Sequence, residues 1–203
     1  MEKPKSYHDL VIKDGKFIGE WERLYSEFDD PWMQSDQPNR YSRSAGITHL
    51  KRIKAKSILE CGCGLGYYAD WIHKETGVVP VGIDISENAI NKAKELFPHL
   101  EFIQQDLLAA LDAHQHVDAI LFAEIMWYIL PELPEVIEKL KTLYKGKHLV
   151  IIQVFYKGSQ KYGTEYFTSM QELIDYMPFE CVAQVEATSS ADTTIETATL
   201  FKI

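Results

Sequence analysis

Long hydrophobic runs and clusters of positive charge are both missing from this sequence. No apolar run approaches the ~18 residues that a membrane-spanning helix needs, and no basic run extends beyond a few residues. The 203 residues carry 30 acidic against 21 basic side chains, which gives a formal charge of −9. Because a phosphate backbone is bound by clustered lysine and arginine, we expect neither nucleic acid nor a membrane as a partner.

Cysteine is also scarce. The chain has three cysteines, an odd number, and two of them (Cys61 and Cys63) lie inside a glycine-rich turn. This usage indicates a reducing compartment, and no signal peptide is recognisable, so the sequence predicts a cytoplasmic protein. A hydrophobic content of 46% in 203 residues predicts one globular domain with a full core.

The most informative stretch is residues 57–72, where an apolar run leads through alternate glycines into helix-spaced apolar positions. This pattern predicts a strand, a tight turn and a helix, the entry unit of a doubly wound α/β domain. The glycines allow backbone to approach a ligand closely. Glu60 precedes them and would repel a pyrophosphate, and Tyr67 stands where a dinucleotide motif needs its last glycine. The sequence therefore favours a cationic ligand over a dinucleotide.

The run from Glu60 to Gly66, acidic-x-Gly-x-Gly-x-Gly, resembles motif I of the class I S-adenosylmethionine-dependent methyltransferases. The cofactor of that family, S-adenosyl-L-methionine, carries a positive ammonium and a positive sulfonium. The resemblance implies an α/β fold with a seven-stranded, doubly wound, Rossmann-like sheet of strand order 3-2-1-4-5-7-6 and an antiparallel last strand. It divides the single domain 1–203 into an N-terminal helical lid (1–52) and a cofactor-binding core (53–203).

Acidic residues follow the next two predicted strands. Asp84 ends the strand 78–84, where its carboxylate can accept hydrogen bonds from two ribose hydroxyls. Asp106 and Leu107 match the family positions that contact adenine. The resemblance thus implies a cofactor-binding set made of Trp32, Tyr41, Arg43, Glu60, Cys61, Gly62, Gly64, Gly66, Asp84, Ile85, Asp106, Leu107 and Ala123.

Two further stretches resemble the subgroup that contains the nodulation-factor N-methyltransferases. They are Asp30-Pro31-Trp32 followed by Tyr41-x-Arg43, and the run from Ala123 to Tyr128. The subgroup implies that the N-terminal segment folds over the cofactor, with Trp32 covering the site and Tyr41 and Arg43 near the methionine end. The sequence departs from it in carrying Ser42 where the subgroup has Glu.

The predicted acceptor pocket lies between Trp32, Glu124, Tyr128 and Tyr162, with Glu124 and Tyr128 as candidate catalytic residues. The predicted reaction is methyl transfer to a small molecule, an amine on a sugar-like metabolite. The alternative reaction is that of a small-molecule O-methyltransferase, whose hydroxyl acceptor would need a base, for which Glu124 is the candidate. The other reading of Glu124 is that it caps the helix after its strand. Three other readings stay open, namely a non-catalytic S-adenosylmethionine-binding protein, an NAD-dependent oxidoreductase and an aminopropyl transferase.

Other expectations concern local structure and metal. Residues 1–14 are polar and expected to be loosely held, and the spacing predicts a helix over 17–28. His114-x-His116 and Cys61-x-Cys63 lack the further ligands that a metal site needs, so we expect no metal. The sequence makes no prediction of the oligomeric state.

Overall fold

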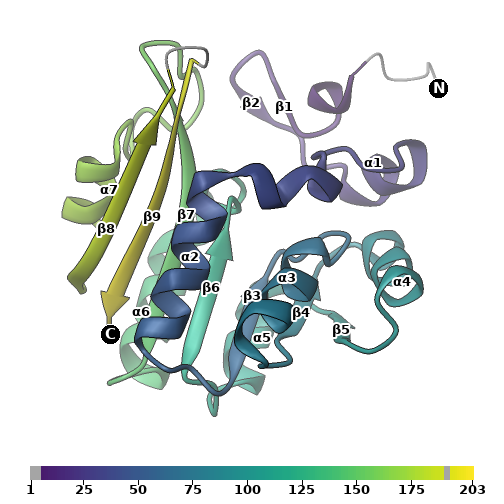
Figure 1. The fold of residues 1–203 in the computed structure, drawn as a ribbon. Helices are drawn as coiled ribbons and strands as arrows, with labels where there is room; N and C mark the ends of the chain where they lie inside the picture. The colour runs from purple at the N-terminus through teal and green to yellow at the C-terminus, as the bar shows by residue number, and fades with distance from the viewer. Residues whose placement is uncertain (1–5, 190–192) are drawn as a thin grey trace.

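The computed structural model describes residues 6–189 and 193–203. Its centre is a seven-stranded sheet of order β5-β4-β3-β6-β7-β9-β8 (Figure 1). Strands β3 to β7 are parallel to one another, and β9 runs antiparallel to both of its neighbours. Numbered from β3, this is the predicted order 3-2-1-4-5-7-6, so the predicted fold class is confirmed. The strands are β3 (Ile58–Cys61), β4 (Val81–Asp84), β5 (Glu101–Gln104), β6 (Ala119–Ala123), β7 (His148–Tyr156), β8 (Glu180–Thr188) and β9 (Thr194–Lys202).

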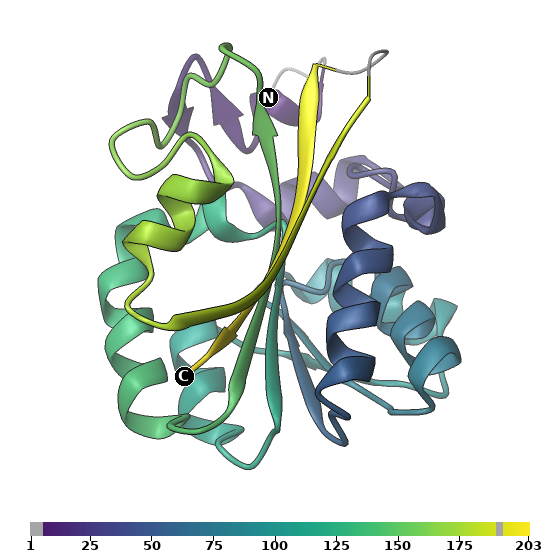
Figure 2. The ribbon, with the colours of Figure 1, turned by 60° about the vertical axis from the view of Figure 1, so that its left-hand side comes forward.

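Helices cover both faces of the sheet, as Figure 2 shows. One face carries α2 (Tyr41–Arg52), α3 (Tyr67–Thr76) and α4 (Glu87–Leu96); the other carries α5 (Leu107–Ala113), α6 (Leu133–Leu143) and α7 (Met170–Tyr176). Strand β6 is apolar throughout because both of its faces are covered. Leu121 packs against the α2 and α3 side, whereas Ile120 and Phe122 pack toward α5 and α6.

The N-terminal segment differs from its prediction. It forms η1 (Tyr7–Asp9), the short strands β1 (Ile12–Lys13) and β2 (Lys16–Phe17), α1 (Trp21–Glu27) and η2 (Gln34–Asn39). The expectation of a loosely held tail is wrong for the described residues 6–14, because Leu10 and Val11 are 2% exposed. The helix predicted from residue 17 begins at Trp21, since Phe17 pairs with Ile12 in a hairpin.

This segment lies across the carboxyl-end edge of the sheet (Figure 1). Leu24 and Tyr25 of α1 are buried against Leu65 and Ala89 of the core. The Glu22 carboxylate accepts hydrogen bonds from backbone N–H groups at the start of α4, which joins the segment to the core by polar contacts too. In the part of the chain that the structure describes, no helix is long and apolar enough to cross a membrane.

The loop after β6 contains two short 3-10 helices, η3 (Met126–Tyr128) and η4 (Leu130–Glu132). With the glycine turn after β3 and the ends of β4 and β5, this loop forms the rim where open α/β sheets bind ligands.

Candidate functional site

The glycine turn after β3 has a left-handed backbone at each of its three glycines, with φ of 70° at Gly62, 55° at Gly64 and 79° at Gly66. Each glycine faces a different neighbour. A side chain at Gly66 would meet Phe102, and one at Gly62 would meet Ile125, so these two glycines serve close packing. Gly64 alone faces the N-terminal segment.

Glu60 lies at the centre of the site and is 1% exposed in β3. Burial raises the pKa of Glu60 to about 8, while the positive charge of Arg43 acts in the opposite direction. Its Oε2 has no hydrogen-bond partner among the described residues. A buried carboxylate oxygen without a partner is costly, so this atom is suited to receiving a donor from a ligand.

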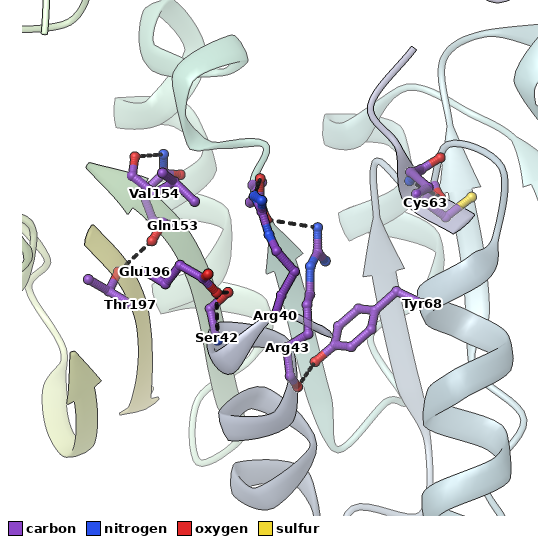
Figure 3. A network of polar contacts seen from close by, with 11 residues as sticks. Arg40, Ser42, Arg43, Cys63, Tyr68, Gln153, Val154, Glu196 and Thr197 are labelled. Carbon is purple, nitrogen blue, oxygen red and sulfur yellow. Dashed lines mark hydrogen bonds and ion pairs between the residues drawn. The ribbon is translucent and has the colours of Figure 1, made fainter. Parts of the chain in front are cut away.

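Arg43 reaches the same region from α2 and is 4% exposed (Figure 3). Its guanidinium carbon lies 4.6 Å from the centroid of the Tyr68 ring, and the Tyr68 hydroxyl donates to the Arg43 carbonyl at 2.7 Å. One guanidinium nitrogen, Nη2, lies 3.2 Å from Oε1 of Glu124. Its Nε has no hydrogen-bond partner among the described residues, so a buried donor remains available beside the buried Glu60 acceptor.

Glu124 directly follows β6 and has a φ of 63°, a left-handed conformation that is strained for a residue with a side chain. Its carboxylate pairs with two arginines, with Arg43 at 3.2 Å and with Arg40 at 3.5 Å. Its N–H donates to the Ile152 carbonyl at 2.8 Å, which fixes the backbone. The side chain thus bonds to α2 and its flank, and η3 has no side-chain cap. Strain of this kind concentrates at functional sites.

Asp84 at the end of β4 is 9% exposed and has both oxygens engaged by backbone. Oδ2 accepts from the Gly64 N–H and Oδ1 from the Ser86 N–H, each at 2.9 Å. Burial raises its pKa to about 6, while these backbone donors lower it. Asp84 therefore ties β4 to the glycine turn, and the exposed Ile85 follows it at the rim.

Asp106 is the N-cap of α5, where its Oδ1 accepts from the N–H groups of Leu108 at 2.9 Å and Ala109 at 3.3 Å. Leu107 is the first residue of that helix. Asp84 and Asp106 follow neighbouring strands, so the structure brings both to the same edge of the sheet.

The aromatic side chains of the predicted acceptor pocket form a connected row. Tyr128 lies 5.8 Å from Trp32 and 4.9 Å from Trp21, measured between ring centroids. Tyr162 stacks on Phe17, with the ring centroids 6.4 Å apart. Among the described residues, Tyr162 has no ring contact with Trp32. The row joins the N-terminal segment to the loops after β6 and β7.

The remaining predicted residues divide by exposure. Cys61 and Ala123 are buried at the ends of their strands, while Tyr41 is 67% exposed at the start of α2. Ser42, which departs from the subgroup pattern, donates through its hydroxyl to Glu196 of β9 at 2.9 Å (Figure 3). Glu196 of β9 therefore places a carboxylate beside residue 42, the position at which the subgroup carries Glu.

Three contributors have no signal in the sequence. Arg40 pairs with Glu124, Glu196 binds Ser42, and Gln34 binds the glycine turn. Gln34 and Arg40 stand in a polar loop without a motif, and each partner is distant along the chain. Gln34 and Arg40 share only one signal, which is their position in a segment that precedes the core and can fold back over it.

Comparison with known proteins gives one family match. Residues 58–147, from β3 to the start of β7, match the family model described as a methyltransferase domain. This match and the fold together support a class I S-adenosylmethionine-dependent methyltransferase. No protein of curated function matches the chain.

Solved structures share the fold of this chain. The N-methyltransferase NodS from Bradyrhizobium japonicum WM9, in complex with S-adenosyl-L-homocysteine, has a TM-score of 0.66 at 22% identity, covering 86% of this chain and 92% of that chain. The methyltransferase domain of bacterial CtHen1-CN has a TM-score of 0.64 at 14% identity, covering 84% and 100%. TehB from Haemophilus influenzae has a TM-score of 0.62 at 16% identity, covering 85% and 66%. At these identities the likeness concerns the fold.

Proposed function

We propose that this chain is an S-adenosylmethionine-dependent methyltransferase that methylates a neutral amine on a small, sugar-like molecule. The observation that carries the proposal is the double ion pair of Glu124 with Arg40 and Arg43. A hydroxyl acceptor needs a base, and the one acid expected to serve is engaged by two arginines. A neutral amine attacks with its own lone pair and needs no base. That NodS, which shares the fold, is an N-methyltransferase agrees with this choice.

When bound, S-adenosylmethionine supplies an electrophilic methyl group on a sulfonium. The chain's own residues would hold the amino-acid end of the cofactor. Glu60 Oε2 is a buried acceptor without a partner and suits an ammonium, while Arg43 Nε is a buried donor without a partner and suits a carboxylate, both judged among the described residues. These two orphaned atoms fit the charges of a methionine end. Tyr41 and Trp32 belong to the same proposed set.

The adenosine half would lie along the rim beyond β4 and β5. Asp84 would accept from the ribose hydroxyls, because a carboxylate oxygen can accept a second hydrogen bond beside its backbone donor. Ile85 offers an exposed apolar side chain to the adenine, Asp106 an acceptor for the amino group, and Leu107 a backbone N–H.

The acceptor would be held beside Tyr128 and Trp32. The two rings lie in contact, exclude water from the reacting groups and restrict the orientation of the amine. Alignment of this kind can lower a barrier by roughly 7–11 kcal/mol in favourable cases. Glu124 would accept a hydrogen bond from the amine N–H while it stays paired with the arginines. The nitrogen lone pair forms the new N–C bond as the S–C bond breaks, and the methylated ammonium then gives its proton to water.

Transfer from methyl-labelled S-adenosylmethionine tests this function. The acceptors are an amino sugar, its N-acetylated form and the parent sugar that bears a hydroxyl in place of the amine. We expect label in the free amine alone, with a rate that rises with pH as the amine loses its proton. Label in the acetylated or amine-free sugar would establish O-methylation instead. Cofactor binding without transfer to a broad amine panel would indicate a binding protein.

We also propose a cytoplasmic protein that does not act on nucleic acid. Cys61 and Cys63 are free and buried, and Cys181 is free, as expected for a reducing compartment. The net charge of −9 disfavours a phosphate backbone as substrate.

A further inference from the structure

The Gln34 side chain is bound to the backbone of the glycine turn. Its Oε1 accepts from the Leu65 N–H at 2.7 Å, and its Nε2 donates to the Cys63 carbonyl at 3.3 Å. Gln34 is 8% exposed although it belongs to a short 3-10 helix outside the core. One carboxamide thus satisfies a donor and an acceptor of the turn.

The same carboxamide lies directly against Gly64. A Cβ on Gly64 would stand 2.5 Å from Gln34 Oε1 and 2.8 Å from its Nε2, and 2.7 Å from the Tyr25 hydroxyl. These distances show that the space above the glycine is filled. Tyr25 is itself held there, since its hydroxyl accepts from Trp32 Nε1 at 3.2 Å.

A carboxamide and the amino-acid end of S-adenosylmethionine present the same kinds of group. Each offers N–H donors and oxygen acceptors a short distance apart, so each can satisfy a backbone carbonyl and a backbone N–H together. We propose that Gln34 is an internal stand-in for that end of the cofactor, occupying the turn in the ligand-free chain and displaced when cofactor enters. The inference rests on the proposed cofactor site. It makes the Gln34 side chain a gate over the glycine turn, whose opening is coupled to cofactor binding.

The way Gln34 is held suits a part that moves. The Asp30 carboxylate accepts from the N–H groups of Gln34 at 2.7 Å and Ser35 at 2.9 Å, so a compact local unit carries the side chain. Met33 comes just before it with a φ of 50°, a left-handed conformation strained for methionine. Strain at Met33 is present while Gln34 binds the turn and would be released when the Gln34 side chain leaves it.

There is room beside this unit for such a movement. A cavity of about 360 Å³ separates it from α3 and α4; its lining includes Asp29, Asp30 and Ser35 on one side and Leu65, Tyr67 and Lys92 on the other. The unit from Asp30 to Ser35 therefore has open space beside it and is joined to the glycine turn by the two hydrogen bonds of Gln34, while α1 stays packed on Leu65 and Ala89.

Calorimetric titration with S-adenosylhomocysteine tests the inference. A protein that binds ligand only in its open form has a dissociation constant raised by the closed fraction. Removing two hydrogen bonds of the closed form in Q34A should therefore tighten binding by about 3- to 30-fold. Q34N keeps the amide but is one methylene too short to span the turn, so it should tighten binding as well. Q115A removes a glutamine that bonds only a carbonyl near the far end of α5 and should leave affinity unchanged.

Each other result is decisive. Weaker binding by Q34A and Q34N would make Gln34 a ligand contact, and unchanged binding would make it a packing residue; both overturn the inference while leaving the cofactor site in place. If the unaltered protein and both variants fail to bind, the proposed function fails and the inference fails with it. Circular dichroism establishes that each variant is folded, and Q34N serves if Q34A is not.

Discussion

The Arg43 guanidinium lies 3.2 Å from the Glu124 carboxylate, although 81 residues separate them along the chain. Arg43 belongs to α2, and Glu124 directly follows β6. The pair thus fixes α2 to the rim of the sheet, and it places a positive charge beside the buried Glu60. Glu124 is 28% exposed in its side chain, so its charge is screened in part by solvent.

Replacing Glu124 by glutamine separates the possible roles of its charge. If it accepts a hydrogen bond from an amine, E124Q should lower kcat/KM by about 10- to 100-fold, the worth of one hydrogen bond to a charged group. The loss should be equal at every pH, because no proton passes to Glu124. Steady-state kinetics across a pH series measures this.

A different outcome would change the chemistry. A loss near 10⁴-fold together with the disappearance of a titrating limb would make Glu124 a general base and favour a hydroxyl acceptor. S-adenosylhomocysteine affinity, measured alongside, tells whether the substitution has disturbed the cofactor site through Arg43.

Asp84→Asn probes the ribose contact. The amide keeps the shape and one acceptor oxygen but loses the charge, so we expect cofactor affinity to fall by about 10- to 150-fold. Calorimetry gives the dissociation constant. Asp118→Asn is the matched control, since Asp118 also accepts from a backbone N–H, that of Lys56 at 2.9 Å, at the opposite end of the sheet. Equal affinity in D84N and the unaltered protein would remove Asp84 from the ribose.

Asp106 combines a helix cap with the proposed adenine contact, and two substitutions separate them. Serine is as good an N-cap as aspartate, so D106S should leave stability within about 0.5 kcal/mol. D106A should lose about 1 kcal/mol. Both variants lack the carboxylate and should bind cofactor about 10-fold more weakly. Thermal unfolding and calorimetry on the same samples decide; unimpaired binding by D106S would leave Asp106 as a cap alone.

The core of the fold could be predicted because its signals are local. Apolar runs mark the buried strands, and Gly66 and Ser86 mark the helix starts that follow them. The strand order came from the family resemblance, whose motif I lies within residues that the structure places at the centre of the sheet.

The N-terminal segment was predicted less well because its order comes from distant contacts. Leu10 and Val11 look like part of a polar tail until α1 and the core cover them. Phe17 fits the helical spacing of residues 17–28, yet its pairing with Ile12 and the left-handed backbone at Gly19 keep it out of the helix. Gln34 has no local signal at all, since its partners are 29 and 31 residues away.

Separation along the chain also limits how much of the candidate site could be predicted from the sequence. The acidic residues of the candidate site could be predicted because each lies in or just after a strand whose pattern the sequence displays. They are Glu60, Asp84 and Asp106. Neither the pairing of Glu124 with Arg40 nor that of Ser42 with Glu196 follows from spacing, because each joins elements 84 or 154 residues apart.

Glu60 gives the last prediction, which concerns pH. Burial raises the pKa of its folded-state carboxyl from 4.5 to about 8, so the folded protein binds a proton that the unfolded chain releases. The contribution of this group to stability is therefore full below about pH 4.5 and is lost as pH rises toward 8. The slope for one proton is about 1.4 kcal/mol per pH unit. Asp84, whose folded-state pKa is about 6, makes a contribution to stability of the same sign, which is lost at lower pH.

Glu60→Gln removes the titrating group and keeps the shape. Between pH 6 and 8, we expect the free energy of unfolding of the ligand-free protein to fall, and that of E60Q to fall less steeply. An ammonium partner needs the ionised carboxylate, so cofactor binding at pH 7 should release close to one proton from the unaltered protein and fewer from E60Q. Denaturant titrations give the stabilities, and calorimetry in buffers of different ionisation enthalpy gives the protons. Q153A, at another buried polar side chain with an unpartnered oxygen, is the control for burial alone. If E60Q and the unaltered protein release equal numbers of protons, Glu60 is not the group that receives the ammonium.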